Sequence, residues 1–151
     1  KECTCTPQQI TNYIGKISGP LLDRIDINAS ASSVKYSDLE SLEKPECSSI
    51  IKERVNNARK KQLNRYKEYG IFSNSELTPN LIKKFCRLDS SAENILKNAY
   101  EKMGLSARGY GRVLKVARTI ADLDNSDIIL SKHIAEAIQY RKLDKKYWKN
   151  K

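Results

Sequence analysis

One amphipathic segment most constrains the fold of this 151-residue chain. It runs from Ser106, a good helix N-cap, to about residue 124, and no Pro interrupts it. Apolar side chains recur along it at helical spacing, at Tyr110, Val113, Leu114, Ala117, Ile120 and Ala121. Because each residue advances about 100° around a helix, Arg108, Arg112 and Lys115 form a stripe roughly opposite. The sequence therefore predicts a helix with one face in a core and the other turned to anions.

The first turn of this helix contains Arg108, where a cation is unfavourable against the positive end of the helix dipole. A bound phosphate would be stabilised by both the guanidinium and the helix N-terminus. A nearby carboxylate would also hold Arg108, and the residues alone leave both interpretations open. Arg118 is closer to the apolar edge and has Asp122 four residues on, so we expect a mainly structural ion pair there.

Cap residues and apolar spacing predict several more helices. We expect them over 7–17, 48–69, 79–86, 91–103 and from 131, with a short one after Ser37. The N-terminal caps expected are Thr6-Pro7, Thr78-Pro79, Ser90 with Glu93, and Ser131, and the expected helix ends are Gly70 and Gly104. With 39% hydrophobic and 30% charged residues, the chain has the composition of a globular domain. The predicted fold is mainly α, a helical bundle over 34–151 that follows a small polar hinge over 29–33.

The helix expected over 48–69 has the highest density of basic residues. Its apolar stripe is Ile51, Val55, Ala58, Gln62 and Tyr66, and its other faces include Arg59 and Lys60. The net charge of the chain is +10, and all of the excess lies after residue 28. This balance favours a polyanionic partner such as nucleic acid, contacted by Arg59, Lys60, Arg112 and Lys115, although a merely solvated basic surface explains the charge as well.

The segment over 17–27 forms a narrow pattern. Gly19-Pro20 predicts a chain reversal, Leu21-Leu22 a buried turn, and the alternation from Ile25 a short strand over 25–29. Arg24 stands between turn and strand, which would hold it at a fixed point rather than on a loose loop.

This pattern, Leu21-Leu22-Asp23-Arg24-Ile25-Asp26, resembles the end of the catalytic core in Mg-chelatase-related AAA+ ATPases of the ComM/YifB type. Three further stretches fit that family: Cys3-Thr4-Cys5-Thr6-Pro7, Leu105-Ser106-Ala107-Arg108 and Val116-Ala117-Arg118-Thr119-Ile120-Ala121-Asp122-Leu123. The resemblance implies that residues 1–28 end an AAA+ core and that 34–151 form its helical C-terminal lid. It also implies that Arg24 is the arginine finger, acting on a neighbouring subunit's nucleotide, and that Arg108 is the sensor 2 arginine on ATP phosphate.

The same resemblance implies ATP with Mg2+ as the cofactors of the intact protein, a hexameric ring, and DNA as the substrate in branch migration. The chain itself has no G-x-x-x-x-G-K-[ST] phosphate loop, since Gly15-Lys16 is followed by Ile17. We therefore expect no cofactor and no hydrolysis by the isolated chain. It begins with Lys, and we expect it to be part of a longer protein.

Four cysteines are present, and only Cys3 and Cys5 are close in sequence. No His follows at zinc spacing, so reduced thiols and no metal site are predicted. In the resembling family a second Cys-x-Cys stands upstream, which would make this pair half of a metal site. The sequence shows neither a signal peptide nor an apolar run long enough for a membrane span, so we expect a cytoplasmic protein without a membrane partner.

Two other functions remain open on the sequence. One is a stand-alone basic helical DNA-binding module, which the positive charge of the chain supports. The other is the lid of a true Mg-chelatase ATPase subunit, whose substrate is a metal inserted into a porphyrin. The basic lid and the Cys-Thr-Cys-Thr-Pro stretch favour the ComM-like function over the latter.

Overall fold

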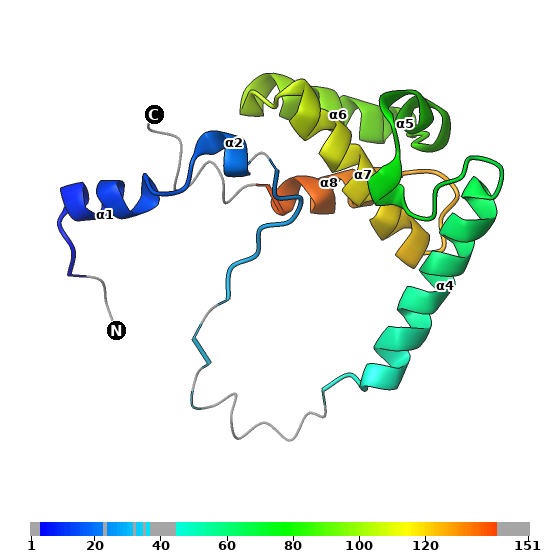
Figure 1. Ribbon diagram of the computed structural model, residues 1–151, viewed down its shortest axis with the longest axis horizontal. Coiled ribbons are helices and arrows are strands. Elements are labelled where there is room, and N and C mark those ends of the chain that lie inside the picture. The colour runs from blue at the N-terminus through cyan, green and yellow to red at the C-terminus, as the bar shows by residue number, and fades with distance from the viewer. Residues whose placement is uncertain (1–3, 23, 32, 35, 37–44, 142–151) are drawn as a thin grey trace.

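The computed structural model describes residues 4–22, 24–31, 33–34, 36 and 45–141. Within them the chain forms a helical bundle and a separate N-terminal arm (Figure 1). The prediction of a mainly helical fold is confirmed. The helix expected after Ser37 falls largely outside the described residues, as does Cys3.

The bundle is built around one long central helix, α7 (Ala107–Leu123). Its apolar face is buried at Val113, Leu114, Ala117 and Ala121, as the spacing predicted. Helix α8 (Ser131–Gln139) packs on α7, and α6 (Ser90–Met103) packs on α8. The shorter α5 (Pro79–Phe85) and the 3-10 turn η1 (Asn74–Glu76) cover α7 from the side of α4. Each helix contributes one apolar face, so together they enclose one core.

Helix α4 (Ser48–Tyr66) contacts α7 only along its C-terminal half (Figure 1). There Ala58, Gln62 and Tyr66 are buried. Ile51 and Val55 continue the same stripe toward the N-terminus, but their side chains are 41% and 45% exposed. The predicted apolar stripe is therefore buried only in its C-terminal half. Periodicity identifies one face of a helix, but it does not show how much of that face packs against another helix.

Side-chain caps mark the start of some helices, whereas Cys47 before α4 and the predicted cap Thr78 before α5 make no side-chain cap hydrogen bond. The Oγ of Ser106 accepts from the backbone N of Gly109 at 3.0 Å, and Gly104 ends α6 with a φ of 56°, both as predicted. Two caps were predicted one residue too late. Asp89, rather than Ser90, caps α6 by accepting from the backbone N of Ala92 at 2.6 Å.

The second displaced cap is at α8, where Ser131 is the first helical residue and not the cap. The backbone N of Leu130 instead donates to Nδ1 of His133 at 3.0 Å. The opposite ring nitrogen, Nε2, lies 2.9 Å from the Oδ2 of Asp124. These two contacts give the buried His133 a structural role at the start of the helix.

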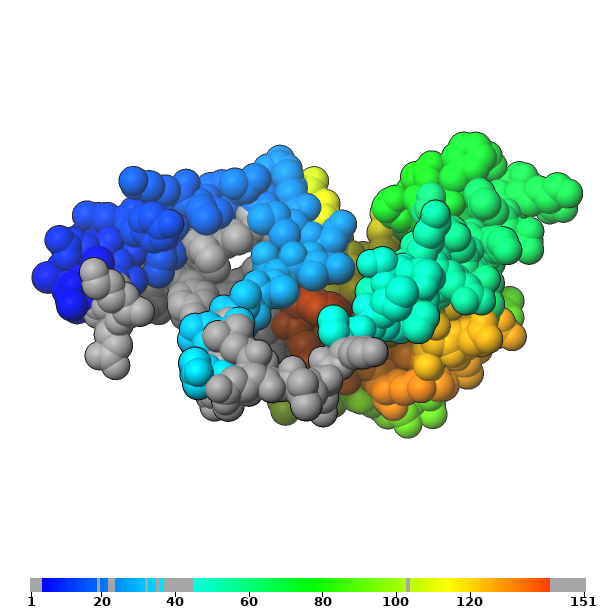
Figure 2. All heavy atoms as spheres, turned by 90° about the horizontal axis from the view of Figure 1, so that it is seen from below, coloured from blue at the N-terminus to red at the C-terminus, as the bar shows by residue number. Residues whose placement is uncertain are grey.

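The N-terminal arm consists of α1 (Pro7–Ile14) and the single turn α2 (Gly19–Leu22). Thr6 and Gln9 form a full capping box at the start of α1, as the Thr-Pro sequence indicated. No described residue of α1 is buried, and the arm extends away from the bundle (Figure 2). The turn at Leu21 was expected to be buried, but this side chain is 49% exposed.

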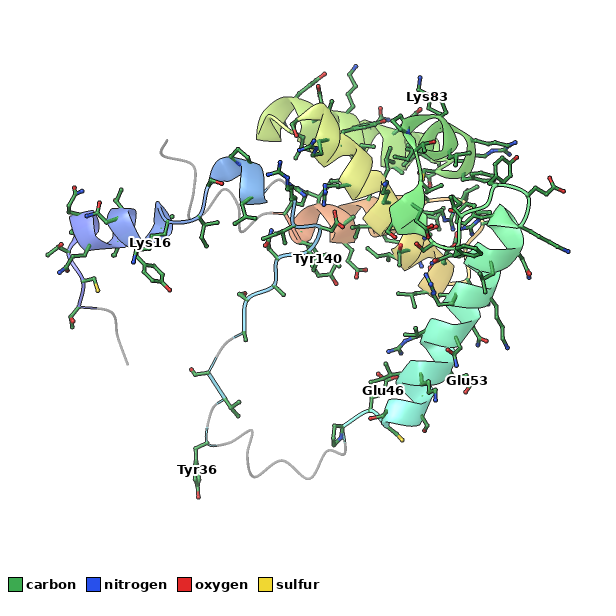
Figure 3. The ribbon with its side chains drawn as sticks, viewed as in Figure 1. Lys16, Tyr36, Glu46, Glu53, Lys83 and Tyr140 are labelled. Carbon is green, nitrogen blue, oxygen red and sulfur yellow. The ribbon has the colours of Figure 1, made fainter. Side chains whose placement is uncertain are left out.

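The strand expected over 25–29 does not form. A strand needs a neighbour for its backbone groups, and the single β-bridge among the described residues joins Leu88 and Ile129 elsewhere. Residues 24–28 instead cross the bundle in an irregular conformation, where the backbone N of Asn28 donates to the carbonyl of Tyr140 at 3.0 Å. Figure 3 labels Tyr140 at this crossing, beside the end of α8.

Candidate functional site

The start of α7 presents Arg108 to solvent. The Oγ of the Ser106 cap accepts from the N–H of Gly109, and the positive end of the helix dipole lies at this first turn. The Arg108 side chain is exposed, and no hydrogen bond or ion pair to it is found among the described residues. The carboxylate partner that the sequence left open is therefore not seen in the described part of the chain.

A cavity of about 500 Å³ lies beside the first three turns of α7. Arg108, Arg112 and Lys115 line it from α7, Ser75 from η1, and Asp26 from the N-terminal segment. The rest of the wall is apolar or small: Leu77, Pro79, Ile82, Ala107 and Gly111. Three cations and one carboxylate thus surround a space large enough for several phosphate groups, at the N-terminus of a long helix.

Two of the three cations also bind groups of this chain. Lys115 donates from Nζ to the carbonyl of Ser75 at 2.8 Å, which ties α7 to η1. Arg112 donates from Nη1 to the carbonyl of Arg24 at 2.6 Å and pairs with Asp26 through the same nitrogen. Of the four residues predicted to contact nucleic acid, Arg112 and Lys115 therefore share the cavity with Arg108. Arg59 and Lys60 lie on α4, outside the cavity lining.

Arg24 follows α2 and is exposed. Its backbone N donates to the carbonyl of Leu21 at 2.9 Å, and its Nη1 donates to the carbonyl of Pro20 at 3.2 Å. These bonds hold Arg24 on its own turn, outside the cavity lining. The structure therefore joins the Arg24 backbone to the side chain of Arg112, four residues after Arg108 on α7, without placing the guanidinium groups of Arg24 and Arg108 in one cavity.

A buried polar network anchors α4 to α7 behind this site. The carboxylate of Asp122 accepts from both terminal nitrogens of Arg65, from Nε of Arg118 at 3.2 Å, and from Nδ2 of Asn74 at 2.9 Å. Arg118 also donates to the backbone carbonyls of residues 126 and 127. The ion pair of Arg118 with Asp122 was predicted, whereas Arg65 and Asn74 were missed because nothing in the spacing links them to α7.

Burial opposes the ionisation of Asp122. The hydrogen bonds from Arg65 and Asn74 and the charge of Arg118 outweigh it and hold the pKa of Asp122 below its ordinary value. In the same region, burial raises the pKa of the Cys86 thiol to about 11. The network is thus ionised and saturated, which fits a structural role.

The cysteines form no metal site within the described residues. No group of three or more His, Cys, Asp or Glu side chains there is placed to hold a metal ion. Cys5 is exposed near the start of the arm, and its neighbour Cys3 lies outside the described residues. The half-site at Cys3 and Cys5 therefore stays a prediction.

A separate question is whether the chain could span a membrane. Among the helices that the structure describes, none is both long and apolar enough to cross a lipid bilayer.

Comparison with known proteins assigns most of the chain to one class. Residues 45–141 match the family model described as magnesium chelatase, subunit ChlI C-terminal, and residues 1–39 match that of magnesium chelatase, subunit ChlI. The chain therefore belongs to the Mg-chelatase-related family of AAA+ ATPases, and the bundle corresponds to its C-terminal part.

Individual relatives place the chain more narrowly. It is 39% identical over 142 residues to the protein YifB of Escherichia coli, covering 93% of this chain and 27% of YifB. It is 36% identical over 137 residues to the competence protein ComM of Haemophilus influenzae, covering 90% of this chain and 26% of ComM. The protein Rv2897c of Mycobacterium tuberculosis is 30% identical over 141 residues, 93% of this chain and 28% of that protein. The chain thus spans about a quarter of the length of these relatives and is ComM-like within its family.

Proposed function

We propose that this chain is the C-terminal lid and arginine-finger part of a longer ComM-like AAA+ ATPase. In that protein it completes an ATP site at a subunit interface of a ring, a hexamer in the resembling family. The observation that supports this most is the position of Arg108, exposed and without a recorded partner in the described part of the chain, in the first turn of a 17-residue helix. Beside it lies the cavity with Arg112 and Lys115.

In this proposal Arg108 is the sensor 2 arginine and binds ATP phosphate. A guanidinium binds phosphate oxygens through charge-assisted hydrogen bonds, and the N-terminus of α7 adds its own positive end. The bound nucleotide would also remove the unfavourable contact of a cation with the helix dipole. The phosphate loop and the ligands of Mg2+ would come from the rest of the longer protein.

Arg24 is the arginine finger in this proposal. It sits on an exposed turn outside the cavity, which supports action on a nucleotide other than the one bound at Arg108. A guanidinium stabilises the charge that develops on the transferring phosphoryl group, and in other enzymes such an arginine contributes about 10³- to 10⁵-fold in rate.

Exposed apolar side chains on the N-terminal arm support the proposal that the rest of an AAA+ core lies next to it in the longer protein. Ile10, Tyr13 and Ile17 lie along one side of the segment that begins at α1, and they are 41%, 74% and 38% exposed. An amphipathic helix normally buries its apolar side, so we propose that this side packs on the rest of the AAA+ core.

We further propose that ATP hydrolysis is coupled to DNA remodelling or branch migration in the cytoplasm, as the ComM-like resemblance implies. The basic surface, with Arg59 and Lys60 on α4, supports a DNA partner. The lid of a true Mg-chelatase subunit is the alternative within the family. The 36–39% identity to YifB and ComM over at least 90% of the chain favours the ComM-like function.

Two variants of the full-length protein test the ATP site. Arg24→Ala should lower the turnover of ATP by about 10³-fold or more and leave ATP affinity nearly unchanged, because a finger acts in the transition state. Arg108→Ala should weaken ATP binding by about tenfold or more, since it removes a charge-assisted hydrogen bond to the bound nucleotide. Steady-state ATPase kinetics and equilibrium binding of a fluorescent ATP analogue measure the two effects.

Arg54→Ala serves as the matched control, since it removes an exposed arginine that pairs with Glu46 at the far end of α4. Its turnover and nucleotide affinity should equal those of the unmodified protein. Normal turnover in Arg24→Ala together with normal ATP affinity in Arg108→Ala would rule out the proposed ATP site.

A further inference from the structure

The segment that follows Arg24 is held against the bundle from two helices. From α7, Arg112 binds the carbonyl of Arg24 at 2.6 Å and the carboxylate of Asp26. From the end of α8, Arg141 donates to the carbonyl of Ile25 at 3.2 Å, and Tyr140 accepts from the backbone N of Asn28 at 3.0 Å. Residues separated by about a hundred positions in sequence are thereby joined at one place.

Arg112 makes the contact nearest to Arg24. A single nitrogen, Nη1, binds both the main chain of Arg24 and the side chain of Asp26, two residues further on. The residues on both sides of Ile25 are therefore held by one atom of α7, Arg24 through its backbone and Asp26 through its side chain. The Arg112 side chain is 23% exposed and that of Asp26 53%, so water competes only partly for the pair.

We infer that Arg112 is a positioning residue for Arg24. It ties the backbone at Arg24 to α7, four residues after Arg108, and so fixes where the turn with Arg24 lies relative to Arg108. This inference rests on the proposed function of Arg24 and Arg108. It gives Arg112 a role within the chain, in place of the nucleic-acid contact that its helical stripe predicted.

The contact has little to do with the stability of the bundle. Ile25 and Ile27 beside it are 38% and 52% exposed, so the segment buries little apolar surface. A partly exposed ion pair adds little to folding stability. No residue of the segment 24–28 belongs to the buried core cluster of the bundle. Loss of Arg112 should therefore change the placement of Arg24 and leave the fold intact.

Kinetics of Arg112 variants in the full-length protein test this role. Arg112→Ala should lower kcat for ATP hydrolysis by about 10- to 100-fold, with a much smaller change in KM for ATP and a nearly unchanged melting temperature, because a small displacement of a catalytic group costs rate more than binding. Arg112→Lys should recover most of kcat, since one ammonium can replace the one nitrogen that makes both contacts. Arg54→Ala, which breaks the ion pair with Glu46, is again the control with normal kcat.

Hydrogen exchange on the same variants reads the placement directly. The amide of Asn28, which donates to Tyr140, should exchange faster in Arg112→Ala, whereas the core amides of α7 should keep their protection. Unchanged exchange at Asn28 would contradict the inference.

The outcomes separate the inference from the proposed function. If Arg24→Ala abolishes turnover and Arg112→Ala has normal kcat, the inference fails and the finger assignment survives. If Arg24→Ala has normal turnover, the finger assignment itself fails and the inference fails with it. If Arg112→Ala weakens duplex DNA binding and retains normal kcat, Arg112 is a DNA contact and the inference is overturned.

Discussion

At the scale of single residues, the structure shows a carboxylate whose environment decides its charge. Asp122 has a fully buried side chain, yet two guanidinium groups and the Asn74 amide keep it ionised. The same arrangement fixes the geometry of α4, η1 and α7 at once. Removing one member of such a network leaves the others buried without a partner, which costs more than the bonds themselves contribute.

We predict that Asp122→Ala lowers the free energy of unfolding by about 3–5 kcal/mol, because Arg65 and Arg118 lose their counter-charge. Urea unfolding followed by circular dichroism measures the change. Asp127→Ala removes an exposed carboxylate a few residues away and should shift the free energy of unfolding by less than about 0.5 kcal/mol. Equal stability of the two variants would contradict the importance of the network.

The pH dependence follows with a definite sign. The folded pKa of Asp122 lies below its ordinary unfolded value of about 3.9. The stabilisation from its ionised form is therefore fully present above about pH 4 and is lost as the pH falls through the lowered folded pKa. In the variant Asp122→Ala this part of the acid destabilisation should be absent.

At the scale of elements, α4 shows that a regular apolar stripe predicts a helix but not how much of the helix is packed. Its stripe is regular over the whole helix, but only the C-terminal half lies on α7. The N-terminal half extends past the bundle, where Glu46 and Glu53 are labelled in Figure 3. The polar network around Asp122, rather than the apolar stripe alone, fixes which half is held.

The two halves of α4 should therefore respond differently to substitution. Tyr66→Ala removes a fully buried ring and its 2.6 Å hydrogen bond to Asn74, and should cost about 3–5 kcal/mol in the free energy of unfolding. Val55→Ser, on the same stripe but 45% exposed, should cost less than about 1 kcal/mol. Chemical denaturation measures the free energy of unfolding of both variants. A similar loss in the two would mean that the N-terminal half of α4 is also packed in solution.

The sequence predicted what is decided by near neighbours along the chain. The helices expected over 7–17, 48–69, 79–86, 91–103 and from 131 all form, but the first two end three residues early, at Ile14 and Tyr66. The Thr6 and Ser106 caps, the Gly104 end and the pair of Arg118 with Asp122 were also found. The prediction failed in two situations: where a neighbouring residue caps a helix better than the expected one, and where a structure depends on a partner far away in the sequence. Asp89 and His133 displaced the expected serine caps, and the strand over 25–29 finds no pairing strand in the part of the chain that the structure describes.

In the candidate site, too, the features set by local sequence could be predicted and the contacts between distant residues could not. The position of Arg108 in the first turn followed from the Ser106 cap, and the shared face of Arg108, Arg112 and Lys115 followed from helical spacing. The contact of Arg112 with Asp26 spans 86 residues of sequence, and no local rule relates the two. The cavity and the crossing segment could therefore be seen only in the structure.

At the scale of the whole molecule, the charge of +10 fits both the proposed function and a stand-alone DNA-binding module, and the affinity of the chain for DNA separates the two. As a lid, this chain alone should bind duplex DNA weakly, with affinity in the micromolar range or worse at physiological salt, because non-specific contacts to phosphate are strongly screened. Fluorescence anisotropy with a labelled duplex over a salt series measures this. Submicromolar affinity of the isolated chain at physiological salt would instead favour the DNA-binding module.

The hydrogen bond between Asn28 and Tyr140 also has a mechanical consequence. It closes a long loop of chain that contains every helix from α4 to α8. Tension applied between the arm and the end of α8 is therefore borne first by this bond and by Arg141 and Arg112 beside it, and not by the helices.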